Sequence, residues 1–157
     1  MIEIRTSPTL ERFDGKQMVC IGGGLITIVQ TDTLVGADLS HCNLDWACLP
    51  GADLRAANFS RSSLCGANLR NSDLTGASFE RTDLTGVDLQ SAILTGTNLS
   101  RARLRGARLQ GADLRFAHLE EAALKYARYD ETTLWPEDFD LQERGAKLPS
   151  QVREWQV

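Results

Sequence analysis

Large apolar residues recur with a period of five over most of the chain. From Leu34 to Leu134, every fifth position holds leucine, phenylalanine or tyrosine, which gives 21 repeats in one register. The position two residues earlier is usually small, and in 13 of these 21 repeats it is alanine. This period matches neither a helix, with about 3.6 residues per turn, nor an alternating strand. Because residues two apart on an extended segment point the same way, the pattern predicts short extended segments that bury both side chains.

Corners must join these segments, because the other positions of each repeat lie outside the core. Glycine stands two places after the apolar residue in eight repeats, as at Gly36 and Gly86. This placement suits a corner whose backbone needs a positive φ or a close approach. The sequence therefore predicts a coil that turns once in every repeat.

Units of the form A(D/N)LxG carry a family resemblance. Examples are Ala37-Asp38-Leu39, Ala52-Asp53-Leu54, Ala67-Asn68-Leu69 and Ala112-Asp113-Leu114. They resemble the pentapeptide repeat family, and the resemblance spans residues 32–136. It implies an all-β fold, a right-handed quadrilateral parallel β-helix in which four pentapeptides form one square coil. About five coils at a spacing of about 4.8 Å would make a rod about 25 Å long.

Both ends of such a rod need a cap, because an open coil exposes unpaired backbone and core. Residues 1–31 are assigned to an N-terminal segment and cap, in which residues 17–31 are expected to form a strand pair. Residues 137–157 are assigned to a helical C-terminal cap and tail. Pro136 marks the expected helix start, and Gly145 lies near its end.

Apolar residues near the C-terminus suggest two further contacts. Trp135 and Phe139 are expected to plug the open end of the core. The tail SQVREWQV, with Val152 and Trp155, is a candidate contact for a homodimer. The measurement that tests this dimer is light scattering, and a strictly monomeric chain would remove the tail contact.

Composition narrows the partners and the compartment. The formal net charge is only −4, so the chain lacks the positive surface field that binding to nucleic acid or to an anionic membrane normally needs. The start of the chain does not resemble a secretory signal, and the apolar run MVCIGGGLITIV is too short to span a bilayer. No CxxC spacing occurs among Cys20, Cys42, Cys48 and Cys65. We therefore expect a cytoplasmic protein with reduced thiols and neither a zinc site nor a disulfide framework.

Residues twenty apart would stack on one side of a four-sided coil, so the sequence can be sorted into columns. One column holds His41, Arg61, Arg81, Arg101 and Glu121. The stripe that we predict as the contact surface for an acidic protein patch comprises Arg61, Arg81, Arg101 and Arg105. The alternative is a solvated wall without a partner. Part of the nearby basic charge would be neutralised by the adjacent coil, through two pairs: Asp83 with Arg103 and Asp88 with Arg108.

The sequence offers no catalytic constellation. Its two histidines, His41 and His118, fall in different columns near opposite ends of the rod. Neither a cofactor nor a metal site is expected. The leading prediction is a non-enzymatic scaffold for protein–protein interaction, similar to the many family members, common in photosynthetic bacteria, that have no assigned biochemical activity.

Two other functions are compatible with the expected fold, but the sequence fits them less well. Some family members imitate duplex DNA, bind DNA gyrase, a type II topoisomerase, and can protect it from quinolones; this is the alternative prediction. The expected rod is shorter than theirs, and residues 100–128 carry seven basic against three acidic residues, whereas phosphate mimicry needs a negative field. A flat ice-binding face is a third option, because Thr75 and Thr95 would stack, but Arg55 and Arg115 interrupt their column.

Overall fold

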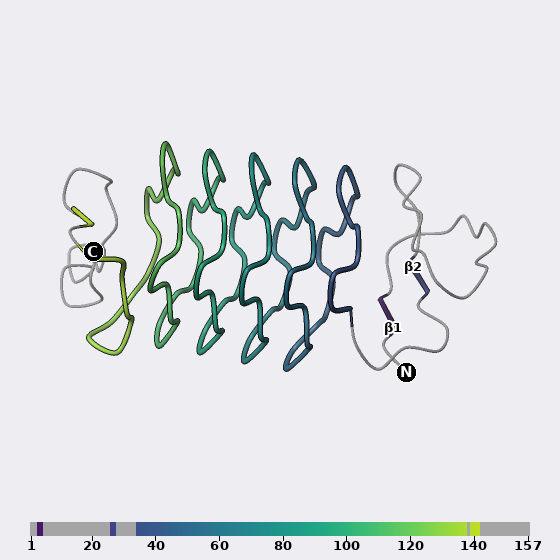
Figure 1. The fold of residues 1–157 in the computed structure, drawn as a ribbon, viewed down its shortest axis with the longest axis horizontal. Helices are drawn as coiled ribbons and strands as arrows, with labels where there is room; N and C mark the ends of the chain where they lie inside the picture. The colour runs from purple at the N-terminus through teal and green to yellow at the C-terminus, as the bar shows by residue number, and fades with distance from the viewer. Residues whose placement is uncertain (1–2, 5–25, 28–33, 138, 142–157) are drawn as a thin grey trace, which may run out of the picture.

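The repeats form a stack of four-sided coils. The computed structural model describes residues 3–4, 26–27, 34–137 and 139–141, and Figure 1 shows the coils side by side along the long axis of the chain. Parallel bridges join each coil to the next between residues twenty apart, as in Asp38 with Asn58. In one such ladder, four bridges join residues 38, 58, 78, 98 and 118, which lie on five successive coils. The predicted parallel β-helix of about five coils is confirmed.

All but one of the corners from residue 36 to residue 126 are tight turns closed by a backbone hydrogen bond; at the corner of His41 the amide of Cys42 donates to the hydroxyl of Ser62 instead. At the first corner, the amide of Ala37 donates to the carbonyl of Leu34 over 3.0 Å. A type II turn requires a positive φ at its second central residue. All nineteen corner residues from 36 to 126 meet this requirement, eight of them glycine and eleven of them other residues. The sequence thus predicted the role of the glycines correctly, but the turn conformation extends to residues such as Ala56 and Arg61.

Backbone hydrogen bonds hold successive coils together. The amide of Leu39 donates to the carbonyl of Asn58 over 2.7 Å, and the amide of Asn58 donates to the carbonyl of Ala37 over 2.9 Å. The corners take part as well, since the amide of His41 donates to the carbonyl of Ser60 over 3.1 Å. Because these bonds use only the backbone, the outward side chains are left to vary.

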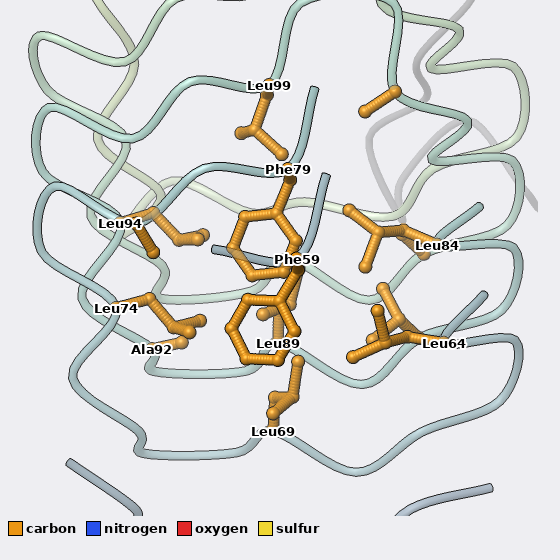
Figure 2. Packing of buried hydrophobic residues seen from close by; sticks show 14 of the residues in the cluster. Phe59, Leu64, Leu69, Leu74, Phe79, Leu84, Leu89, Ala92, Leu94 and Leu99 are labelled. Carbon is orange, nitrogen blue, oxygen red and sulfur yellow. The ribbon is translucent and has the colours of Figure 1, made fainter. Parts of the chain in front are cut away.

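The apolar rows fill the inside of the coils. Figure 2 shows Leu74 and Leu94 entering from one side and Leu64 and Leu84 from the opposite side, with the phenylalanines between them. Each of these four leucines is fully buried. Phe59 and Phe79 stack with ring centroids 4.8 Å apart and planes inclined by only 2°. The core is therefore a set of parallel columns, one from each side of the coil.

Buried hydroxyl groups replace alanine at several inward positions. The hydroxyl of Ser62 donates to the carbonyl of Leu39, and that of Thr82 donates to the carbonyl of Phe59, each over 2.6 Å. These bonds satisfy groups that would otherwise cost free energy in an apolar interior.

The cysteines differ from the prediction at one position. Cys42 is buried, as expected for an inward residue, but it is disulfide-bonded to a partner outside the described residues. The expectation of reduced thiols throughout is therefore wrong for Cys42. It holds for Cys48 and Cys65, which are free.

The five-residue register ends one repeat earlier than predicted. Leu134 is 44% exposed, and its bridge to Asp113 joins residues 21 apart instead of twenty. One extra residue in the last turn moves Thr133 into the alanine position and Trp135 into the leucine position. Placing Leu134 in the core was therefore wrong, because two adjacent large apolar residues compete for one place.

Asp130 holds this lengthened turn in place. Its carboxylate accepts hydrogen bonds from the hydroxyl and the amide of Thr132, over 2.6 and 3.0 Å. It also accepts the amide of Gly111, one coil away, over 3.2 Å. These hydrogen bonds, that from the Thr132 hydroxyl foremost, hold the pKa of Asp130 below its usual value.

Aromatic rings cover the C-terminal end of the core. Trp135 meets Tyr129 edge to face and stacks on Phe139, with ring centroids 5.5 Å apart in both contacts. All three rings pack against the buried cluster. In the described part of the predicted helical cap, residues 137 and 139–141, there is no helix. The rest of that segment, including the tail with Val152 and Trp155, lies outside the described residues.

Two short strands belong to the N-terminal segment. Strand β1, Glu3–Ile4, pairs with strand β2, Ile26–Thr27, in antiparallel register. Strand β2 falls inside the predicted strand pair of residues 17–31, but its partner comes from the first residues of the chain. The remainder of residues 1–33 lies outside the described residues.

Candidate functional site

Three of the four predicted stripe arginines share one column. Arg61, Arg81 and Arg101 occupy equivalent corners of successive coils, with φ of 61°, 57° and 60°. The amide of Arg61 donates to the carbonyl of Glu80, and that of Arg81 to the carbonyl of Ser100, which fixes the spacing of the column. Arg105 lies on the next corner of the coil that contains Arg101. The structure therefore brings together three of the four residues and places the fourth across one side of the rod.

Acidic neighbours neutralise part of the column. The guanidinium of Arg101 contacts both carboxylate oxygens of Glu121, over 3.1 and 3.0 Å. These hydrogen bonds from Arg101 keep the pKa of Glu121 below its usual value. Arg81 Nε lies 3.7 Å from Glu80 Oε1. In the described part of the chain, the side chain of Arg61 forms no ion pair.

The two sides that follow this column along the chain each carry one of the ion pairs predicted from the sequence. Arg103 lies 3.4 Å from Asp83, and Arg108 lies 3.7 Å from Asp88. Arg70 approaches Asp88 from the other direction, over 3.5 Å. The aspartates thus join one coil to the next. They also neutralise two of the four arginines in residues 101–109, namely Arg103 and Arg108.

A cluster of basic side chains lies around Tyr126, and sorting the sequence into columns did not identify it. The guanidinium carbon of Arg105 lies 5.5 Å from the centroid of the tyrosine ring, and Lys125 Nζ lies 5.1 Å from it. Arg128 stands two residues further along the last coil. The signal was available in the sequence, because residues 102–109 stack on residues 122–129 and neither segment contains an acid.

Other candidate groups have structural partners. The stacked carboxylates of Asp53 and Asp73 share Arg55, which lies 2.7 Å from the first and 3.8 Å from the second. The guanidinium of Arg55 therefore offsets part of the negative charge of the two stacked carboxylates.

The remaining polar groups do not converge on one site. His118 Nδ1 lies 3.8 Å from Glu120, whereas His41 belongs to the first coil. Burial raises the pKa of the Cys65 thiol. In residues 34–137 and 139–141, no three His, Cys, Asp or Glu side chains are grouped so that they could hold a metal ion. Within the same described ranges, no helix is long and apolar enough to cross a bilayer.

Trp46 explains one of the corner glycines. Trp46 is 77% exposed, and its indole ring lies so close over Gly66 that an added Cβ would overlap the ring. A side chain at residue 66 would therefore meet the indole ring of Trp46, whereas the positive φ of this corner is one that eleven non-glycine corners also adopt. The corner glycines of the next two coils, Gly86 and Gly106, have open space at the corresponding position.

The repeat pattern identifies the family. The family model for pentapeptide repeats matches the chain in eight copies over residues 33–55, 52–90 and 82–120, more than half of its length. The chain belongs to the pentapeptide repeat family. As in other pentapeptide repeat proteins, the fold is a right-handed quadrilateral β-helix.

Several pentapeptide repeat structures are similar to this chain. HetL, involved in heterocyst differentiation regulation in Nostoc sp. strain PCC 7120, is 40% identical over 59% of this chain and 48% of its own, with a TM-score of 0.49. The chain thus spans about half the length of HetL. Rfr23 from Cyanothece 51142 is 36% identical over 63% of this chain and 64% of its own, with a TM-score of 0.37. QnrB1, a plasmid-mediated fluoroquinolone resistance protein, is 18% identical over 76% of this chain and 65% of its own, with a TM-score of 0.36. No curated protein is significantly similar to the chain.

Proposed function

We propose that this pentapeptide repeat protein is a non-enzymatic rod that binds a protein partner through its outer side chains. The backbone bonds between coils fix the outward positions, while the side chains at these positions are free to differ from coil to coil. A rigid scaffold of this kind loses little conformational entropy when it binds. The family supplies the fold, and the side chains supply the specificity.

The observation that carries this proposal is the placement of charge. Aspartates pair with Arg103, Arg108 and Arg115, so these cations serve mainly to join or brace the coils. Arg61 and Arg105, by contrast, form no ion pair in the described part of the chain. Cations that form no internal ion pair are the ones available to an acidic surface.

The predicted stripe remains part of the proposal. Its members are Arg61, Arg81, Arg101 and Arg105. Because Arg101 already holds Glu121 in a bidentate contact, we expect Arg61 and Arg81 to contribute more to binding than Arg101. The stripe is therefore better tested at its N-terminal end.

The experiment is recovery of a partner from nuclease-treated native lysate on immobilised protein, followed by calorimetric titration with the purified partner. We expect saturable binding of a protein that an unrelated acidic control protein does not retain. Arg61→Gln together with Arg81→Gln should weaken this binding if the stripe is used. Retention of no protein above the control would contradict the proposed function.

The gyrase alternative is tested separately. The basic segments at residues 102–109 and 122–129 place positive charge where a DNA mimic needs negative charge. We therefore expect no change in DNA supercoiling by gyrase when the protein is added in excess. Inhibition of supercoiling, or protection against a quinolone, would favour the alternative instead.

Two predictions about the protein in solution also remain to be measured. Cell fractionation tests the expected cytoplasmic location. Light scattering on the full chain, with and without the tail residues 150–157, tests the predicted homodimer. A loss of dimer that follows removal of the tail would support that contact, and a monomer in both cases would remove it.

A further inference from the structure

One corner of the rod concentrates positive charge without any acid. Residues 102–109 and 122–129 lie on adjacent coils, since bridges join Arg103 to Ala123 and Arg108 to Arg128. The amide of Gly106 also donates to the carbonyl of Lys125 over 3.1 Å. Across both segments there are five basic residues and no aspartate or glutamate.

The five cations fall into two groups. Arg103 and Arg108 are paired with aspartates of the preceding coil. The side chains of Arg105, Lys125 and Arg128 form no ion pair or hydrogen bond in the described part of the chain. These three therefore keep their donors available for a ligand.

Tyr126 holds two of these cations together. Arg105 and Lys125 both lie within cation–π distance of its ring, at 5.5 and 5.1 Å. Tyr126 is 47% exposed. An aromatic side chain beside unpaired cations offers a ligand both charge and apolar contact, the combination that is enriched at protein interfaces.

We propose that Arg105, Lys125, Tyr126 and Arg128, the basic corner, bind a short acidic segment of a partner protein. This inference rests on the proposed function and names the surface and the chemistry of the partner. Aspartate and glutamate side chains would accept hydrogen bonds from the three cations, and an apolar residue of the segment would pack on Tyr126.

The charge distribution favours an acidic peptide over nucleic acid or an anionic membrane. The unpaired cations occupy only two coils, which are about 4.8 Å apart, so they match a few carboxylates but not an extended phosphate backbone. The chain as a whole carries a net charge of −4, which repels a large polyanion at long range. A short acidic segment can reach the basic corner without covering the acidic parts of the rod.

The test is fluorescence anisotropy of a labelled Asp/Glu-rich peptide that contains one leucine, titrated with the full-length protein at low and physiological ionic strength. We expect saturable binding that weakens with salt. Arg105→Gln together with Lys125→Gln should lower the affinity about threefold to tenfold. Neither position has a positive φ, so glutamine fits the backbone of both.

The matched control is Arg55→Gln together with Arg115→Gln. These residues occupy the same place in the repeat, lie on the diagonally opposite corner, and change the net charge by the same amount. We expect the control to keep the peptide affinity within about twofold. Equal loss of affinity in the two double variants would overturn the basic corner as the site, because it would show a general effect of charge.

Other ligands give distinguishable outcomes. Tighter binding of a short DNA duplex or of phosphatidylserine vesicles than of the peptide would overturn the choice of an acidic protein segment. Loss of peptide binding with no loss of the partner recovered from lysate would leave the proposed function intact and refute the basic corner. Retention of no protein from lysate, with the peptide still bound at the basic corner, would refute the proposed function alone.

Discussion

The positive-φ corners make a prediction in which one substitution has opposite effects at two sites. Ala56 is exposed and sits at a corner with a φ of 56°, while Ala123 is exposed and lies in an extended segment that bridges to Arg103. Neither side chain belongs to the core. Replacing each alanine by glycine therefore tests the backbone and almost nothing else.

The magnitude follows from two opposing terms. The left-handed conformation costs an alanine about 1–2 kcal/mol, and Ala56→Gly removes this cost. Glycine makes the unfolded chain more flexible, which costs about 0.4–1 kcal/mol. Ala56→Gly should therefore stabilise the fold by about 0.5–1 kcal/mol. Ala123→Gly has only the unfavourable term and should destabilise the fold by about 0.5–1 kcal/mol.

The assay is denaturant unfolding of both variants followed by circular dichroism, with thermal unfolding as a second measurement. The two free energies of unfolding should differ by about 1–2 kcal/mol, and each variant should move Tm by a few degrees in opposite directions. An unchanged m-value would show that both variants expose the same surface on unfolding. If Ala56→Gly destabilises the fold as much as Ala123→Gly does, the left-handed corners are wrong.

Three further predictions concern the core, the C-terminal end and acid stability. Leu89→Ala should cost about 2–5 kcal/mol in denaturant unfolding, because Leu89 is fully buried, whereas the adjacent Gln90→Ala should change stability by less than about 0.5 kcal/mol; equal effects would mean that the register is wrong. Trp135→Ala should destabilise the fold by about 2 kcal/mol and Leu134→Ala by less than about 1 kcal/mol, and the reverse order would restore Leu134 to the core. The pKa of Asp130 is lower in the folded state than its usual value, so its contribution to stability is present above that usual value and is lost as the pH falls through the folded pKa. In urea titrations at a series of acidic pH values, Asp130→Asn should therefore lose less stability on acidification than the wild type, and equal loss would contradict this role.

The core was the part of the fold that the sequence predicted best, because burial repeats with the same period as the backbone. A leucine at every fifth position and a small residue two places before it leave only one arrangement that buries both. The corners were predicted less completely. Glycine marks a positive φ, but Ala56 and Arg61 adopt the same conformation only because the coil has to close there.

The end of the rod could not be read from the pattern. Leu134 and Trp135 are adjacent and both apolar, so periodicity alone selects the first of them. The extra residue of the last turn is held by the hydrogen bonds of Asp130, which depend on a neighbour one coil away. The disulfide at Cys42 likewise leaves no CxxC motif in the sequence.

Of the candidate site, the sequence predicted the column but not the pairing of its charges. Stacking at a distance of twenty residues correctly placed Arg61, Arg81 and Arg101 together. Arg101 and Glu121 are neighbours in that column, but whether their side chains pair depends on their reach, which only the structure gives. The position of Lys125 over the ring of Tyr126 also depends on side-chain conformation, which the columns do not give.

The most direct test of the account is to map where an acidic segment binds. Backbone amide signals of the ¹⁵N-labelled full-length protein would be followed by NMR during titration with the Asp/Glu-rich peptide. We predict that the signals that shift with saturation belong to residues 102–109 and 122–129 and that those around Arg55 and Arg115 stay in place. Shifts spread evenly over all corners, or centred on residues 55 and 115, would contradict binding at the basic corner.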